Sequence, residues 1–244
     1  MPSTYAHRRF GADVLALLPD GLRATLEQHR ELYDIGLHGP DLMFYYKALQ
    51  SNPVNRLGNT MHEQKGEVFF TRARTVVENA PDKDAALAYA LGFVCHFALD
   101  STCHPYVEAY VRESGVGHCE IETEFDNALM REDGLDPIKF FTASHIKPSR
   151  ERAEVIAPFY EGVTVDETLA AMDPAVLRRV AAELPTQLDT TGRAARSRSL
   201  GYGYRGTLPA RRGYVLVLAV VPPAAPRRDP AAFAPLPAPP DPAH

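Results

Sequence analysis

Tryptophan is absent from the 244-residue sequence, and cysteine occurs only three times. So few cysteines, and an odd number, exclude a disulfide framework as the main source of stability and indicate free thiols in a reducing compartment. The net charge of −5 is small, so no global basic field favours nucleic acid or an anionic membrane as a partner. Apolar runs near Ala85–Cys95 and Tyr214–Pro223 are shorter than the ~20 residues that span a bilayer.

The N-terminal segment is a poor signal peptide, because Asp13 interrupts its short apolar run. We therefore expect a cytoplasmic protein without a transmembrane segment. With 45% hydrophobic and 23% charged residues, the chain has the composition of a globular protein that buries a core. Its length allows one ample domain or one domain with an appendage.

Charge and proline are unevenly distributed along the chain. Residues 190–244 contain eight arginines and two acidic residues, a net charge of +6, which leaves −11 on residues 1–189. The same segment holds 10 of the 21 prolines and is low in complexity, so we expect a disordered or aberrant tail after a boundary near Asp189. Gly201–Gly206 matches GxGxxG, but it lacks the flanking strand and helix of a dinucleotide site.

Residues 1–189 are typical of a single multi-helix, all-α domain. Apolar residues recur at helical spacing, Gly36 and Pro40 stand where helices stop and start, and alternating strand patterns are nearly absent. Asn59 is expected to cap the helix predicted over residues 61–79, and Gly117 precedes the one predicted over residues 118–133. The pattern predicts helices over residues 20–35, 41–50, 61–79, 84–100, 118–133, 149–160, 166–172 and 174–184.

The segment 84–100 is almost entirely apolar, so its helix is expected to be covered on every face. His96 and Asp100 are the exceptions, and their spacing of four residues places them on one face. Burial of both side chains is costly unless each has a partner. That partner is either a metal ion or the other member of the pair.

Two further histidines extend this pattern. His104 follows Asp100 by four residues, and Pro105 is expected to bend or end the helix there. His118 and Glu122 form another four-residue pair on the next helix, which brings three histidines and two carboxylates within 27 residues. Imidazole nitrogen and carboxylate oxygen are ligands that zinc prefers, so the pattern predicts a zinc site.

Several short runs together carry a family resemblance: MPSTYAH, DIGLHGPDLMFYY, NTMH, GFVCHFALDSTCHPYVE and HCEIETEFD. They resemble the zinc-dependent phospholipase C family, whose fold is shared with the fungal zinc-dependent nucleases. The resemblance covers about residues 1–170, and every side-chain ligand expected from the family has a match in the expected order.

The resemblance implies two or three zinc ions and eight side-chain ligands: His7, Asp41, His62, His96, Asp100, His104, His118 and Glu122. Asp41, His62 and His96 would hold the first ion. Asp100 would also bind it and bridge to a second ion, held by His7 and the chain's N-terminus. His104, His118 and Glu122 would hold the remaining ion. Secreted relatives place a tryptophan at the N-terminus and a longer spacing between the residues that match Asp100 and His104.

The implied function is hydrolysis of a phosphodiester, with Asp41 as both ligand and base. A phospholipid or a related small metabolite is the expected substrate, and no stable nucleic-acid partner is expected. A nuclease or phosphatase of the same fold and a non-catalytic helical domain with a relic metal site remain alternatives. An unrelated histidine–aspartate phosphohydrolase is disfavoured, because no adjacent His-Asp pair occurs.

Other residues near the proposed ligands receive simpler interpretations. His38 is expected to donate a hydrogen bond to Asp41, and His29 and His145 are expected to be solvated or in loops. Cys95 and Cys119 each adjoin a proposed ligand but are expected to pack rather than bind metal. The aromatic residues of FYYKAL and Phe69–Phe70 serve either as core or as an apolar approach to the site.

Overall fold

The computed structural model describes residues 4–48 and 50–178, and within these ranges the chain forms helices and no strand. This confirms the all-α prediction. The helices are α1 (Thr4–Leu17), α2 (Asp20–Gln28), α3 (Arg30–Gly36), the 3-10 turn η1 (Gly39–Asp41), α4 (Leu42–Tyr45), α5 (Pro53–Glu63), α6 (Gly66–Asn79), α7 (Lys83–Ser114), α8 (His118–Glu132), α9 (Arg150–Ile156), the 3-10 turn η2 (Ala157–Phe159) and α10 (Val165–Ala171).

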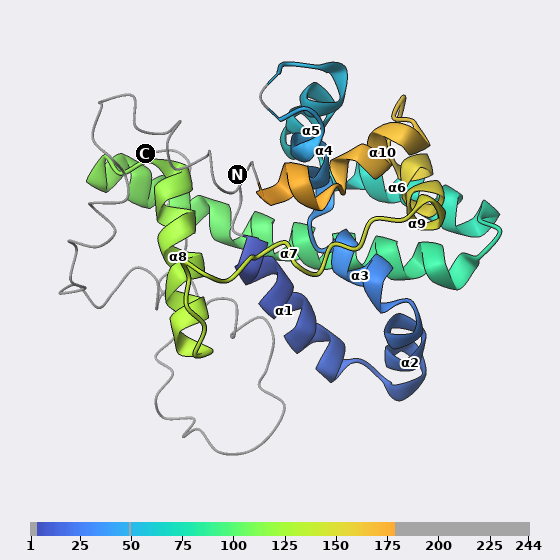
Figure 1. The fold of residues 1–244 in the computed structure, drawn as a ribbon, viewed down its shortest axis with the longest axis horizontal. Helices are drawn as coiled ribbons and strands as arrows, with labels where there is room; N and C mark the ends of the chain where they lie inside the picture. Colours follow the sequence, from blue (N-terminus) through green and yellow to red (C-terminus); the bar gives the residue numbers. More distant parts are fainter. Residues whose placement is uncertain (1–3, 49, 179–244) are drawn as a thin grey trace.

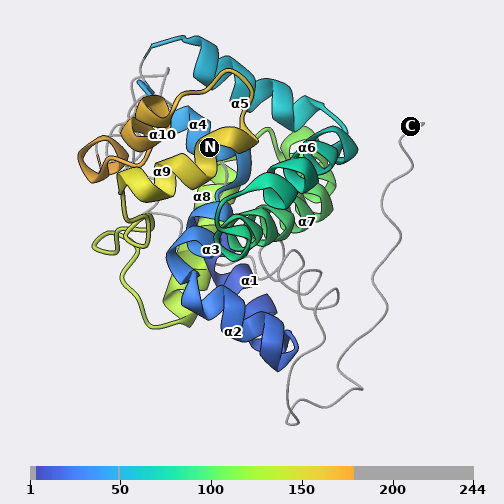
Figure 2. The same ribbon diagram turned by 90° about the vertical axis from the view of Figure 1, so that its right-hand side faces the viewer.

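Helix α7 runs through the middle of the molecule and contacts α1, α2, α3, α6, α8, α9 and η1. In Figure 1 it crosses the view from side to side, with α1 and α2 below it, α3 overlapping it, and α8 across its C-terminal half. Figure 2, turned by 90°, shows α6 alongside α7 and the α9–α10 pair on the other side of α3. Residues far apart in sequence therefore meet along one long helix.

The closest helix crossing, between α3 and α7, depends on two glycines. A Cβ added to Gly36 would lie 2.3 Å from the carbonyl oxygen of Tyr89, and one added to Gly92 would lie 2.2 Å from that of Tyr33. Only glycine permits such backbone contact. Because Gly92 is one turn before His96, the crossing also fixes the depth of His96 in the fold.

Several helix boundaries differ from the predictions. The helix expected over 20–35 is interrupted at His29, which separates α2 from α3. The helix expected over 61–79 is two helices, divided at Gln64 and Lys65. Asn59 lies inside α5, and the capping residue is Asn52, whose side chain accepts a hydrogen bond of 3.0 Å from the Asn55 amide. Pro53 after Asn52 is the stronger start signal, since its fixed φ suits a first turn.

Helix α7 is also longer than predicted. It continues through Pro105 to Ser114 and ends at Gly115, whose φ of 69° is left-handed. The expectation that every face is covered is wrong at Val94 and Phe97, which are each 40% exposed. By length and composition alone α7 could cross a membrane, but 44% of its most apolar window is buried inside the domain. Helix α7 also contacts seven other helical elements of residues 4–48 and 50–178.

The remaining predictions concern the C-terminal part of the chain. Residues 174–178 are helical, and the rest of the helix predicted over 174–184 lies outside the described residues. The predicted boundary near Asp189, the GxGxxG match at 201–206 and the tail over 190–244 lie outside them too. The helical domain is therefore described to residue 178.

Candidate metal centre

All eight predicted ligands come together around the middle of α7. His7 is on α1, Asp41 ends the η1 turn, and His62 is near the end of α5. Helix α7 contributes His96, Asp100 and His104, and the first turns of α8 contribute His118 and Glu122. They form three groups, and within each group the ligand atoms lie within 4.8 Å of one another. The groups are His7/His96/Asp100, Asp41/His62/His96 and His104/His118/Glu122.

The two buried groups share His96. Its Nδ1 lies 3.2 Å from the carbonyl oxygen of Leu37, so its Nε2 is directed into the cluster. The ring of His7 stacks on that of His96 at 4.2 Å. The Nε2 of His62 lies 3.0 Å from Oδ1 of Asp41, and its Nδ1 lies 2.8 Å from the carbonyl oxygen of Gly58. Outer hydrogen bonds of this kind orient imidazole ligands.

Asp100 connects the buried groups to the third group. Its Oδ1 lies 3.7 Å from Nε2 of His7 and 3.3 Å from Nε2 of His104. His104 Nε2 in turn lies 3.6 Å from Oε1 of Glu122, to which Nε2 of His118 lies 2.8 Å away. The three groups are thus one continuous cluster.

The charges of the cluster perturb its titrating groups. Burial opposes ionisation of Asp100, but its contact with His7 and the nearby His96 and His104 hold its pKa below the ordinary range. Burial raises the pKa of Asp41. Burial also disfavours the charged form of His62, yet its contact with Asp41 raises its pKa to about 9. Without a metal, the Asp41–His62 pair therefore holds a proton near neutral pH.

Unpartnered polar atoms mark the same cluster. Buried side-chain atoms without a hydrogen-bond partner include His7 Nδ1, Asp41 Oδ1, His96 Nε2 and Glu122 Oε2. Oδ1 of Asp41 is close to His62 but lacks hydrogen-bond geometry with it. Such atoms are costly to bury. Imidazole nitrogen and carboxylate oxygen form the donor set that zinc prefers, so these residues fit zinc ions.

The η1 turn is shaped to hold Asp41 against His96. Gly39 has a φ of 51°, and a Cβ there would lie 2.3 Å from the His96 ring. The buried hydroxyl of Tyr160 donates a hydrogen bond of 2.8 Å to the Gly39 carbonyl, and Tyr89 bonds the Tyr160 hydroxyl at 2.6 Å. Sequence patterns gave no signal for this tyrosine pair.

Two histidines outside the cluster differ from the expectations: His38 does not bond Asp41, and His145 lies in a loop, as one of its alternatives had it, but is not solvated. His145 is buried, and its Nε2 lies 2.8 Å from Nε2 of His38. His38 Nδ1 lies 3.4 Å from the Tyr45 hydroxyl, so both ring nitrogens of His38 face partners other than Asp41. Burial and the neighbouring His145 lower the pKa of His38, and burial lowers that of His145 to about 3. The pair is therefore neutral and ties the loop after α8 to the segment before η1.

Cys95 is packed in the core, as expected. Cys95 is buried, and its Sγ lies 3.3 Å from the Tyr33 hydroxyl. Burial and the nearby Asp100 and Glu122 raise the pKa of Cys103 to about 12, so this thiol is protonated at neutral pH. The candidate metal groups contain histidines and carboxylates only.

The fold and the site define an all-helical domain built around a cluster of metal-binding residue types. The family described as zinc dependent phospholipase C matches residues 6–168, about two thirds of the chain. The chain belongs to this family. No curated protein and no solved structure matches it.

Proposed function

We propose that this protein is a zinc-dependent phosphodiesterase of the phospholipase C type. The main support is the cluster of eight residues, in which buried nitrogen and oxygen atoms lack other partners, within a chain of this family. We further propose two or three zinc ions, a cytoplasmic location, and a small phosphodiester or phospholipid as substrate, with no stable nucleic-acid partner.

Bound zinc ions would activate water and neutralise the negative charge of the phosphate oxygens. His96, His62 and Asp41 would hold the ions on the buried side, and Asp100 would fix the spacing to His104. Asp41 would also orient the attacking water and take its proton at Oδ1, the atom that lacks a hydrogen bond.

The substrate would approach from the side of the cluster that is open to solvent. The side chains of His62, His104 and His118 are 22%, 31% and 38% exposed, whereas that of Asp41 is 6% exposed. Phe44 stacks on the His62 ring at 5.5 Å and is only partly buried. An apolar group next to the phosphate would meet this ring first.

A nuclease or phosphatase of the same fold is the second candidate, because an aromatic side chain beside the metal residues also suits base stacking. Three substrates assayed in parallel would separate the candidates: a phosphocholine lipid, a nitrophenyl phosphodiester and single-stranded nucleic acid. We expect hydrolysis of the first two. Cleavage of only the nucleic acid would favour the nuclease.

Metal analysis and one substitution test the proposal as a whole. We expect two or three zinc ions per chain and, for Asp100→Asn, a loss of activity of at least about 100-fold with reduced zinc content. Glu78→Gln on the exposed face of α6 is the matched control and should change neither. Zinc-free wild-type protein would contradict the proposed centre and favour a relic site. Full zinc content and full activity in Asp100→Asn would contradict the role proposed for Asp100.

A further inference from the structure

Asp126 lies on the same face of α8 as two of the proposed ligands. It follows Glu122 by four residues and His118 by eight, and residues spaced by four are neighbours on a helix surface. Like Glu122, Asp126 is buried. A buried carboxylate needs strong hydrogen-bond donors, and the proposed metal positions do not include it.

The donors come from the first turn of α1. Oδ2 of Asp126 accepts a hydrogen bond from the Tyr5 amide, and Oδ1 accepts one from the Ala6 amide, each at 2.8 Å. Amides in the first turn of a helix have no partner within the helix, and the helix dipole favours a negative charge there. The carboxylate of α8 therefore caps α1 across a separation of 120 residues.

The next residue after this cap is His7. Its Nε2 lies 3.7 Å from Asp100, and its ring stacks on His96. Because the hydrogen bonds of Asp126 fix the backbone immediately before His7, they also fix where the imidazole enters the cluster.

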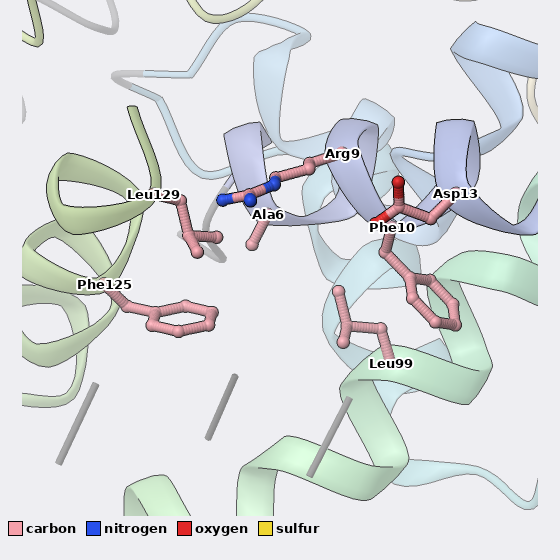
Figure 3. Close-up of a pocket in the computed structure, with 7 residues that line it drawn as sticks. All are labelled: Ala6, Arg9, Phe10, Asp13, Leu99, Phe125 and Leu129. Carbon is pink, nitrogen blue, oxygen red and sulfur yellow. The ribbon is translucent and has the colours of Figure 1, made fainter. Parts of the chain in front are cut away.

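A gap in the apolar packing lies near this cap. A small pocket lies between α1, α7 and α8, lined by Ala6 and Phe10 of α1, Leu99 of α7, and Phe125 and Leu129 of α8. Figure 3 shows Phe125 and Leu129 facing Ala6 and Phe10 across this space. The Asp126 cap joins α1 to α8 beside this gap in their apolar packing.

We propose that Asp126 is a positioning residue of the metal centre, which holds His7 in place by capping α1. It would act through the backbone amides of Tyr5 and Ala6. The inference rests on the proposed function, in which His7 is a zinc ligand. It adds a requirement that the ligands alone do not contain: the zinc position of His7 depends on a carboxylate on α8.

Zinc titration of three variants of the full chain, with a fourth as control, tests this requirement. His7→Ala defines which zinc equivalent depends on His7. Asp126→Ala should weaken that equivalent at least about tenfold and leave the others unchanged, as loss of outer supporting groups does. Asp126→Asn keeps one acceptor and should weaken it less. The absorption spectrum of the cobalt-substituted protein provides a second readout, in which Asp126→Ala should lose the same component as His7→Ala.

Asp133→Asn is the matched control for general loosening of α1. Asp133 also joins α8 to α1, through the Tyr5 hydroxyl at 2.6 Å and through Arg9, but it does not bond the backbone before His7. It should lower thermal stability without changing zinc affinity. Equal weakening in Asp133→Asn and Asp126→Ala, or wild-type affinity in Asp126→Ala, would overturn the inference. Wild-type protein without zinc would overturn the proposed function and the inference together.

Discussion

The two ends of the candidate metal centre are built in different ways. Asp41, His62 and His96 come from three segments that are distant in sequence, and Asp41 and His96 are almost fully buried. His104, His118 and Glu122 come from two consecutive helices, and the two histidines are each about one third exposed. The buried group therefore depends on tertiary packing, whereas the exposed group depends mostly on α7 and α8.

Because the buried group depends on tertiary packing, a change in the packing around it should destabilise the protein most. Gly39→Ala should cost about 3 kcal/mol or more, because a left-handed backbone and a clash with His96 act together. Chemical denaturation of the metal-free protein measures this. Gly115→Ala is the matched control, since Gly115 also has positive φ but nothing lies near its Cβ position. It should cost only about 1–2 kcal/mol, and equal costs would contradict the role of the His96 contact.

Removal of a hydrogen bond behind the buried group should have a smaller effect. Tyr160→Phe leaves the Gly39 carbonyl without its donor and should cost about 2 kcal/mol. Tyr89→Phe removes only the bond between the two tyrosines and should cost less. Zinc binding should weaken at the Asp41 group in Tyr160→Phe. A loss of zinc affinity confined to the His104/His118/Glu122 group would contradict the dependence of the buried group on tertiary packing.

Acid should weaken the protein through its buried histidines. The pKa of His145 is about 3 in the folded protein and about 6.5 in an unfolded chain. As pH falls below 6.5, the unfolded chain gains a proton that the folded protein does not, so stability falls. Between pH 6.5 and 5.5 the loss from this group should be about 1 kcal/mol. Denaturation of metal-free protein at both pH values should show a shallower loss in His145→Gln, and an unchanged pH dependence would contradict this origin.

The smallest change in stability is expected at the exposed group. His118→Gln in metal-free protein should cost less than about 1 kcal/mol, since its ion pair with Glu122 is partly exposed. Its effect should appear instead in zinc titration, as loss of one equivalent. His62→Gln, beside the buried Asp41, is the comparison variant and should cost more stability. Equal costs would remove the distinction between the two ends.

The same difference decides how much of the centre could be predicted. Five of the ligands stand out in the sequence because they recur at intervals of four within a helix: His96, Asp100 and His104 on α7, and His118 and Glu122 on α8. His7, Asp41 and His62 have no such local pattern, and only the family resemblance pointed to them. The structure brings all eight together, and their binding of zinc stays a prediction.

The fold was predictable in class but not at every boundary. Helical periodicity identified the all-α domain, and Gly117 marked the start of α8. The break at Gln64 and the continuation of α7 past Pro105 depend on packing that periodicity does not encode. His145 was missed because its partner, His38, lies 107 positions away, although Asp126 could have been noticed four residues after Glu122.

Helix α7 carries His96, Asp100 and His104 on successive turns of one face. A helix rises ~6 Å over four residues, so α7 sets the distance along its axis between these three side chains. A substitution can remove one of these side chains but does not change the spacing between the others. An inserted or deleted residue between His96 and His104 would rotate the side chains before it away from those after it.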